Sequence, residues 1–378
     1  MDKQLPKIGI IYLTYPTAKW ERDINGCLSS LEKVNYPKDR LELICVESKP
    51  KSTLGPLKDW FDKTWMQKSG KELPNITYIY KAEQLGFAEN NNLGYEKAKE
   101  LGCEYVHLTN EDTYVDPDYL LRAIERVEQD PTIGAVQSLI LLGDAPDKVN
   151  SAGNAFHYLG FGYSSGYHWT KERAITYLEE QRKINPDLEI GYASGAAVLV
   201  RISALEGRPL FEEGLHLYHE DTDLSLFMRM RKFKTVIEPK SILWHHYEFG
   251  KNKFNYYYME RNRYALIWMY YKWPTLVLIF PMLCVMDLAI LFFSIKNGWA
   301  DMKWRAYKDW IVGDFRSFVF RRRREVQKAR LISDHEFLKI AVPDIAFQEE
   351  AVRNPVLEYI GNPLLRAYWA IVRVIICW

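Results

Sequence analysis

Two acidic clusters in this chain have the composition of a reaction site. The first, Asn110–Thr113 (NEDT), follows a strand-like run. Carboxylates in that position suit a hard divalent cation such as Mg²⁺, which prefers one or two of them together with phosphate oxygens and water. The same residues also fit an ordinary turn that opens the next helix, since Asp116 and Pro117 follow at once. Alone, this cluster is a weak signal.

The second acidic cluster, Tyr218–Leu224 (YHEDTDL), contains three carboxylates within four residues and precedes an amphipathic run. Acidic residues in the first turn of a helix stabilise its dipole, and this accounts for Asp221 and Asp223. It does not require Glu220, whose charge would repel that of Asp221. A general base is the alternative role for one member of this pair.

Two further segments have weaker chemical signals. His245 and His246 follow a strand-like run, and an imidazole ligand there would favour Mn²⁺ as well as Mg²⁺, although lone histidines are more often structural. Gly86 precedes a helix that contains Asn91, and the N-terminus of a helix is a natural anion site. An ordinary turn and helix cap explain Gly86 equally well.

Alternating strand and helix patterns position these clusters. Ile8–Thr14 and Leu41–Ser48 have strand patterns, and the helical pattern of Trp20–Val34 between them predicts a parallel βαβ unit. Further elements are expected in the same alternation: strands at Ile76–Lys81, Tyr105–Thr109 and Gly134–Leu141, and helices at Asn90–Leu101 and Pro117–Gln129. The predicted fold class is α/β, with a mostly parallel sheet flanked by helices. In such folds ligands bind outside the carboxyl ends of the strands, where Tyr15, Glu47, Gln84 and Asn110 fall.

The next part of the chain is less regular. Gly143–Leu188 is rich in glycine, serine and aromatics and is expected to form an inserted loop or hairpin region. A strand is predicted at Ala193–Arg201, a helix at Asp221–Arg231, and a last strand at Thr235–Ile237.

Composition excludes some classes of function. The 378 residues carry a net charge of +1, whereas a general nucleic-acid binder usually has a strong basic excess. The five cysteines are scattered and form no CxxC pair, so neither a zinc site nor a disulfide framework is indicated, and buried thiols are expected. Because the sequence begins without a charged-then-apolar leader, we expect the catalytic part to stay in the cytoplasm.

After about residue 250 the composition changes. Leu276–Ile295 is nearly all apolar and long enough to cross a bilayer, but Pro281 and Asp287 weaken a simple spanning helix. Basic residues flank both its ends, which favours a re-entrant or in-plane segment with both ends cytoplasmic. The run Arg321–Arg324 would then meet anionic headgroups, or else form a solvated helix face. Leu364–Trp378 has the composition of a second interfacial anchor.

We therefore expect two parts, a catalytic domain at 1–250 and a helical, membrane-associating region at 251–378. The exposed apolar character of the second part fits self-association into a homo-oligomer equally well.

Taken in order, the motifs resemble those of the family 2 glycosyltransferases with the GT-A fold, especially the rhamnosyltransferase-like branch. The resemblance covers about residues 8 to 271. It rests on these segments: IIYLTYP, LELICVES, LGFAENNNLGYEKA, LTNEDTYVDPDYL, YASGAAVLVR, FEEGLHLYHEDTDLSLFMR, WHHYEFGKN and MERNRYALI. Departures are Asn110 at the first acidic position of the DxD motif, Glu47-Ser48 after the second strand, and Pro16 in place of a frequent Asn.

The resemblance implies a role for each matching residue. Asp112 and His245 would bind a divalent metal, Mg²⁺ or Mn²⁺, and Asp221 would be the catalytic base with Glu220 beside it. The nucleotide-sugar donor would be bound by Tyr15, Glu47, Gln84, Gly86, Asn91, Asn110, Glu111, Ser194 and Gly195. The donor would be a UDP-, dTDP- or GDP-linked sugar, and the reaction a single displacement that inverts the anomeric carbon.

The hydrophobic C-terminal segments suggest a lipid-linked or polysaccharide acceptor and a place on the cytoplasmic face of the cell membrane, monotopic or with one hydrophobic segment. Two alternatives stay open. One is a polyprenyl-phosphate glycosyltransferase; a processive synthase is disfavoured because the QxxRW motif is absent. The other is a non-catalytic scaffold that retains the fold, and a donor-hydrolysis assay would separate it from an enzyme.

Overall fold

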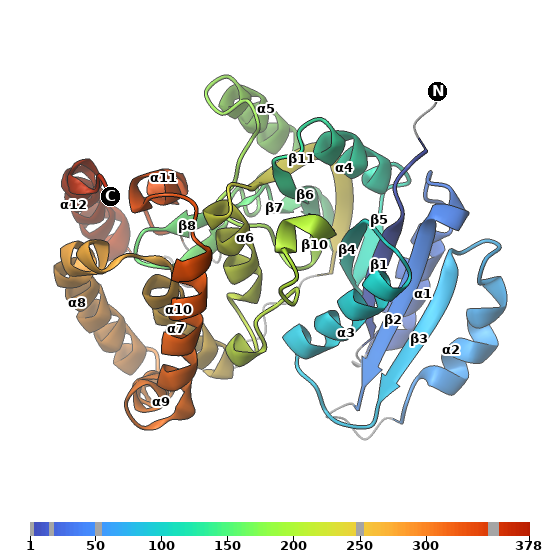
Figure 1. The fold of residues 1–378 in the computed structure, drawn as a ribbon, viewed down its shortest axis with the longest axis horizontal. Coiled ribbons are helices and arrows are strands. Elements are labelled where there is room, and N and C mark those ends of the chain that lie inside the picture. The colour runs from blue at the N-terminus through green and yellow to red at the C-terminus, as the bar shows by residue number, and fades with distance from the viewer. Residues whose placement is uncertain (1–3, 15–18, 50–54, 247–252, 347–354) are drawn as a thin grey trace.

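The computed structural model describes residues 4–14, 19–49, 55–246, 253–346 and 355–378. Its centre is one large sheet with the strand order β3-β2-β1-β4-β10-β6-β11-β5, and β7 pairs with β6 (Figure 1). The strand bounds are β1 Ile8–Thr14, β2 Leu41–Ser48, β3 Asn75–Lys81, β4 Tyr105–Asn110, β5 Thr113–Val115, β6 Ile133–Leu142, β7 Ala145–Ser151, β10 Ala197–Arg201 and β11 Lys234–His245.

The sheet is mixed. Strands β3, β2, β1 and β4 run parallel, as does the pair β6 and β11, but β10 is antiparallel to both of its neighbours. The predicted α/β fold class is confirmed, with more antiparallel pairing than the sequence pattern indicated. Short runs buried on both faces cannot reveal strand direction, which depends on the connections between strands.

Helices cover both faces of the sheet. On one face lie α1 (Trp20–Leu31), α2 (Lys58–Thr64) and α4 (Tyr119–Glu128), which share an apolar core with alternate residues of β1, β2 and β6. On the other lie α3 (Phe87–Glu100) and α6 (Glu220–Met230). Helix α3 packs closely on β1, since a side chain at Gly94 would come within 2.5 Å of Ile11.

The insertion after β6 contains more structure than the predicted loop or hairpin. Strand β7 forms the hairpin with β6, and β8 (Asn154–His157) and β9 (Gly162–Ser164) form a second small sheet with β12 (Ala341–Val342). Helix α5 (Lys171–Arg182) was not predicted because only Ala174 and Leu178 are buried along it, too few for a visible helical stripe.

The last strand of the sheet is much longer than the predicted Thr235–Ile237. Strand β11 continues through Pro239 at an irregularity between Glu238 and Ile242, and it ends at His245. Proline is tolerated in a strand at such bulges, where it removes no ladder hydrogen bond.

The C-terminal helices lie together beside the sheet (Figure 1). They are α7 Lys253–Tyr270, α8 Trp273–Lys296, α9 Ala300–Val312, α10 Asp314–Ala329, α11 Asp334–Phe337 and α12 Asn362–Ile375. Short helical turns are η1 Lys38–Arg40, η2 Met66–Lys68, η3 Ile202–Leu205, η4 Glu213–Leu215, η5 Leu338–Ile340 and the π-type turn η7 Leu357–Gly361. The C-terminal helices share a core with Leu226 and Met230 of α6, so α6 connects the sheet to the helical region. The predicted boundary at residue 250 lies outside the described residues.

Helix α8 is continuous through Pro281, and whether it spans a membrane stays a separate prediction. Within the described residues it is the one helix long and apolar enough to cross a membrane by length and composition. Of the five cysteines, three are buried as expected, whereas Cys284 on α8 and Cys377 after α12 are exposed.

Candidate active site

The carboxyl ends of the central strands meet at one edge of the sheet. Parallel pairing places Glu47 opposite Thr14, and Asn110 opposite Leu13. The antiparallel pairing of β11 with β5 then places His245 opposite Thr113. Segments that are far apart in the sequence, the Asn110–Thr113 cluster and the histidine pair, are therefore neighbours at this edge.

Asp112 and His245 form the first pair of candidate site residues. The Oδ1 atom of Asp112 lies 3.2 Å from Nε2 of His245. Burial of the Asp112 carboxyl opposes its ionisation, but the neighbouring His245 outweighs this and lowers the pKa of Asp112. A carboxylate that stays ionised beside an imidazole is a suitable pair of metal ligands.

The two adjacent histidines have different surroundings. The Nδ1 atom of His246 lies 2.9 Å from Oδ1 of Asp144, and its ring packs against Tyr114. His246 thus points to the β6–β7 turn, and His245 is the histidine that faces Asp112.

This pair fits a cation that is shared with a substrate. No group of three or more His, Cys, Asp or Glu side chains is arranged around a metal position in the part of the chain that the structure describes. Mg²⁺ usually completes such a small protein ligand set with phosphate oxygens and water, and an imidazole extends the choice to Mn²⁺. The donor atoms of Asp112 and His245 therefore suit a metal that arrives with a diphosphate.

Glu220 and Asp221 begin helix α6 after an unusual turn. His216, Tyr218 and His219 all have positive φ angles, between 63° and 70°. Such conformations cost about 1–3 kcal/mol each in residues with a side chain, and they persist where the surroundings enforce them, often at functional sites. This turn aims the first residues of α6 toward the sheet.

Asp221 is held by backbone groups of a second segment. Its Oδ2 accepts a hydrogen bond of 3.2 Å from the N–H of Gly195, and its Oδ1 accepts one of 2.7 Å from the N–H of Thr222. The N–H of the preceding Ser194 donates to Gln137 at 2.9 Å. Ser194, Gly195 and Asp221, all predicted from the sequence to belong to the site, are thus brought together.

Burial raises the pKa values of both Glu220 and Asp221. It raises the pKa of Asp221 to about 6, while the backbone hydrogen bonds from Gly195 and Thr222 act in the opposite direction. Burial and the charge of Asp221 raise the pKa of Glu220 well above its usual range. Within the described structure Oε2 of Glu220 is buried without a hydrogen-bond partner. A carboxyl whose pKa is near neutral is suited to exchange protons.

Asp223, the third acid of this cluster, has a different role. It is fully buried, its Oδ2 lies 2.6 Å from Nη2 of Arg208, and its Oδ1 accepts a bond of 2.7 Å from the hydroxyl of Tyr270. Asp223 therefore connects α6 to α7 as a structural residue.

The residues predicted to bind the donor are spread along the same edge. A side chain at Gly86 would lie 2.9 Å from the ring of His216, so the start of α3 approaches the turn before α6. Gln84 is exposed in the loop between β3 and α3, whereas Asn91 is buried and donates to the carbonyl of Phe87 at 3.0 Å. The carbonyl of Asn110 accepts a bond from Thr113, and Glu111 is buried.

The two remaining residues predicted to bind the donor are Glu47 and Tyr15. Both oxygens of Glu47 already accept hydrogen bonds, from the N–H of Leu57 at 2.8 Å and the hydroxyl of Tyr78 at 2.7 Å, and the side chain is fully buried. Tyr15 lies outside the described residues. The roles of both remain predictions.

One residue that sequence reasoning missed is Asn262 of α7. It is fully buried, and its Nδ2 donates to the carbonyls of Leu215, Leu217 and Tyr218 at 2.8–3.0 Å, all in the turn before Glu220. Its Oδ1 accepts a bond of 2.9 Å from Nε of Arg261, which fixes the orientation of the amide. The signal in the sequence was an asparagine within an aromatic-rich helical segment, but its partners could not be identified without the fold.

Comparisons with known proteins identify the family and the fold of this chain. Residues 12–206, about half of the chain, match the family described as Glycosyl transferase family 2. Among solved structures, GalNAc-T7 with UDP, GalNAc and Mn²⁺ aligns with a TM-score of 0.53 at 14% identity, over 72% of this chain. The alignment spans 49% of the GalNAc-T7 chain, about half its length.

Two further solved structures are similar to this chain. A mannosyltransferase from Pyrobaculum calidifontis with GDP-Man and Mn²⁺ has a TM-score of 0.49 and 15% identity over 86% of each chain. S. aureus TarS 1–349 with UDP-GlcNAc has a TM-score of 0.48 and 14% identity, over 97% of this chain and 88% of TarS. A search of curated protein sequences gave no match. By its family match, this chain belongs to glycosyl transferase family 2.

Proposed function

We propose that this protein transfers a sugar from a UDP-, dTDP- or GDP-linked donor to an acceptor hydroxyl, with inversion at the anomeric carbon and with a divalent metal. The observation that carries the proposal is the separation of two acidic sites. The Asp112 carboxyl, whose pKa is lowered, lies beside the His245 ring near the ends of β4 and β11, whereas Asp221 stands on α6 with its pKa raised to about 6. Leaving-group departure and nucleophile activation occur on opposite sides of the reacting carbon, and each site suits one of them.

In the proposed displacement, Asp221 accepts the proton of the acceptor hydroxyl as its oxygen bonds to the anomeric carbon. The bond from that carbon to the phosphate oxygen breaks, and the nucleoside diphosphate leaves with the electron pair. The N–H of Gly195 keeps Asp221 oriented through its bond to Oδ2. Glu220, whose pKa is raised further, stays protonated and limits the negative charge beside Asp221. Asp112 and His245 would hold the metal, which when bound neutralises charge on the diphosphate.

We further propose a lipid-linked or cell-envelope polysaccharide acceptor and attachment to the cytoplasmic face of the membrane. Support comes from α8, which presents Val277, Phe280, Leu288 and Phe292 to the exterior. Helix α12 presents Ile371 and Val374 in the same way. In this proposal residues 1–250 form the catalytic domain, residues 251–378 form the membrane-associating region, and the chain falls in the rhamnosyltransferase-like branch that the motifs resemble.

Donor turnover by the purified full chain tests this proposal. UDP-, dTDP- and GDP-sugars are each supplied with Mn²⁺ or Mg²⁺ and a membrane lipid fraction, and release of nucleoside diphosphate is measured for the wild type, Asp221→Asn and Asp59→Asn. Asp59 is an exposed residue of α2 and serves as the matched control. We expect release from one donor class, its loss in Asp221→Asn and its retention in Asp59→Asn. Equal release by the wild type and Asp221→Asn would contradict the proposal.

A further inference from the structure

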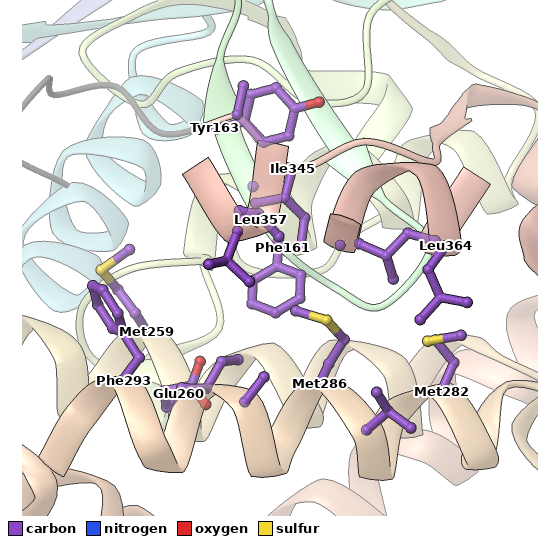
Figure 2. Close-up of a pocket in the computed structure, with 18 of the residues that line it drawn as sticks. Phe161, Tyr163, Met259, Glu260, Met282, Met286, Phe293, Ile345, Leu357 and Leu364 are labelled. Atoms are coloured by element: carbon purple, nitrogen blue, oxygen red, sulfur yellow. The ribbon is translucent and has the colours of Figure 1, made fainter. Parts of the chain in front are cut away.

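A cavity of about 350 Å³ lies among the C-terminal helices, and neither Asp112 nor Asp221 is among the described residues that line it. Figure 2 shows Met282, Met286 and Phe293 of α8 along its floor, with Leu357 and Leu364 opposite them. Phe161 and Tyr163, from the segment that joins β8 to β9 and from β9 itself, close a third side. This volume is in the usual range for small-molecule sites.

The mouth of the cavity is bordered by exposed apolar side chains. Four lining residues are large hydrophobics with about half or more of their surface accessible: Val285 (48%), Leu364 (49%), Val356 (63%) and Ile360 (64%). The outward face of α8 continues this surface with Leu288 and Phe292. Contiguous exposed apolar surface of this kind marks membrane or partner contacts. A ligand that enters here passes from one apolar environment into another.

Among the described residues that line the cavity, Glu260 is the one charged side chain, and it is already paired. Its carboxylate is bonded to Arg263 (Nη2 to Oε2, 3.0 Å) and to Lys303. The other lining side chains are aliphatic, aromatic or thioether groups together with small residues. Methionines such as Met259, Met282 and Met286 adapt to a flexible apolar occupant. The cavity therefore suits a hydrocarbon chain rather than a sugar or nucleotide.

Two residues that line the cavity, Met259 and Tyr256, interact with the turn that precedes the acid pair. The ring of His219, the residue before Glu220, forms a hydrogen bond with the backbone of Met259, which lines the cavity. Tyr218, in the same turn, lies near Tyr256, a second lining residue. A polar head beside Tyr256 and Met259 would therefore lie near the start of α6.

We propose that this cavity binds the hydrocarbon chain of a lipid-linked acceptor and so positions the acceptor hydroxyl at Asp221. The proposal rests on the proposed transferase function. It commits to one occupant because the apolar rim, the neutralised interior and the contact with the turn before α6 together fit a chain with a polar head.

Photolabelling of the full chain in detergent micelles tests the proposal. The probe is hexadecyl phosphate that carries a diazirine at the middle of its chain, and labelled peptides are identified by mass spectrometry. Ala289 lines the cavity and is exposed, so Ala289→Trp should block the mouth with little effect on folding. Ala370→Trp on α12 is the matched control, since Ala370 is exposed but does not line the cavity.

We expect labels on the peptides that contain Met282–Phe293 and Leu357–Leu364, at least fivefold less label in Ala289→Trp, and no change in Ala370→Trp. Equal labelling of the wild type and Ala289→Trp, or label confined to the outer face of α8, would overturn the proposal. Nucleotide binding with Mn²⁺ is measured on the same samples. Nucleotide binding without cavity labelling would contradict the cavity proposal but not the transferase function. Cavity labelling without binding of any nucleotide would contradict the transferase function and therefore also the role of the bound lipid as acceptor.

Discussion

Buried charges are treated differently in the two regions of this molecule. Among helices α7–α9, Glu260, Arg263 and Lys303 are nearly inaccessible to solvent and bonded to one another, and Lys303 also lies 2.6 Å from Asp287. Burial of Glu260 opposes its ionisation, but Arg263 and Lys303 outweigh this and lower its pKa. At the start of α6, by contrast, burial raises the pKa of both Glu220 and Asp221, and no cation among the described residues offsets this effect.

The comparison separates structural charges from reactive ones. A buried ion that is paired and hydrogen-bonded holds elements together, and loss of one partner is costly. A buried acid whose pKa is shifted by desolvation, next to a crevice, is a candidate for proton transfer. Substitutions in the first region should therefore act on stability, and those in the second on turnover.

The largest effect is expected for Asp221→Asn. The amide keeps the shape of the side chain but cannot accept the acceptor proton, so kcat should fall by about 10²–10⁴-fold. Stability should not decrease, because the change removes a carboxylate that burial disfavours. Steady-state kinetics and thermal unfolding measure the two quantities. A variant that unfolds readily but turns over normally when folded would reverse the assignment.

The next largest effect is expected for Lys303→Met in the paired region. Glu260 and Asp287 would lose a shared buried cation, and the free energy of unfolding should decrease by about 3–5 kcal/mol. Lys308→Met, an exposed change on the same helix, should stay within about 0.5 kcal/mol of the wild type. Urea denaturation of the three proteins provides the comparison. A change under about 1 kcal/mol in Lys303→Met would show that the network is not structural.

A smaller effect is expected for Asn262→Ala. Asn262 of α7 connects the two regions, because its amide contacts the turn before α6. Three carbonyls of the turn before Glu220 would each lose the hydrogen bond from the Asn262 amide. Displacement of Asp221 should lower kcat by about 10–100-fold, with the affinity for the nucleotide unchanged.

Asn262→Asp removes the donors but keeps the size, so it should not restore turnover. The exposed change Asn35→Ala should have no effect on turnover. An equal loss of nucleotide affinity and of kcat in Asn262→Ala would indicate general unfolding rather than misplacement of the acid.

The smallest expected effect is on pH dependence. With the pKa of Asp221 raised to about 6, kcat should rise with pH through that value as the base ionises. The folded state holds this proton more tightly than the unfolded state, whose carboxyl has a pKa near 4. Stability should therefore fall as pH rises from about 4 to 6, and the fall should be weaker in Asp221→Asn. A pH-independent kcat between 5 and 7 would contradict this assignment.

The sequence predicted the central strands well because their patterns are local. Runs such as Ile8–Thr14 and Leu41–Ser48 are buried along their whole length and bounded by turn residues, and the observed strands have the same bounds. Elements that depend on tertiary context were missed, namely α5, with its two buried residues, and the part of β11 beyond Pro239.

The candidate site could be predicted in part. The motifs predicted Asp112, His245 and Asp221 as residue types at strand and helix ends, and the pairing of β11 with β5 explains why the first two are neighbours. The motif resemblance singled out Asp221 as the base, but only the fold shows that Asp223 is structural, because it places Arg208 and Tyr270 beside it. The link from Asn262 to the turn spans more than forty residues and has no local signature.

Nucleotide binding tests the central claim most directly, because it requires neither the acceptor nor the sugar to be known. UDP, dTDP and GDP are titrated calorimetrically into the full chain with and without Mn²⁺, for the wild type and Asp112→Ala. The account predicts that one nucleotide binds only with the metal, and that its affinity falls by roughly tenfold or more in Asp112→Ala. Binding of none of the three to the folded protein, or metal-independent binding that Asp112→Ala leaves unchanged, would contradict it.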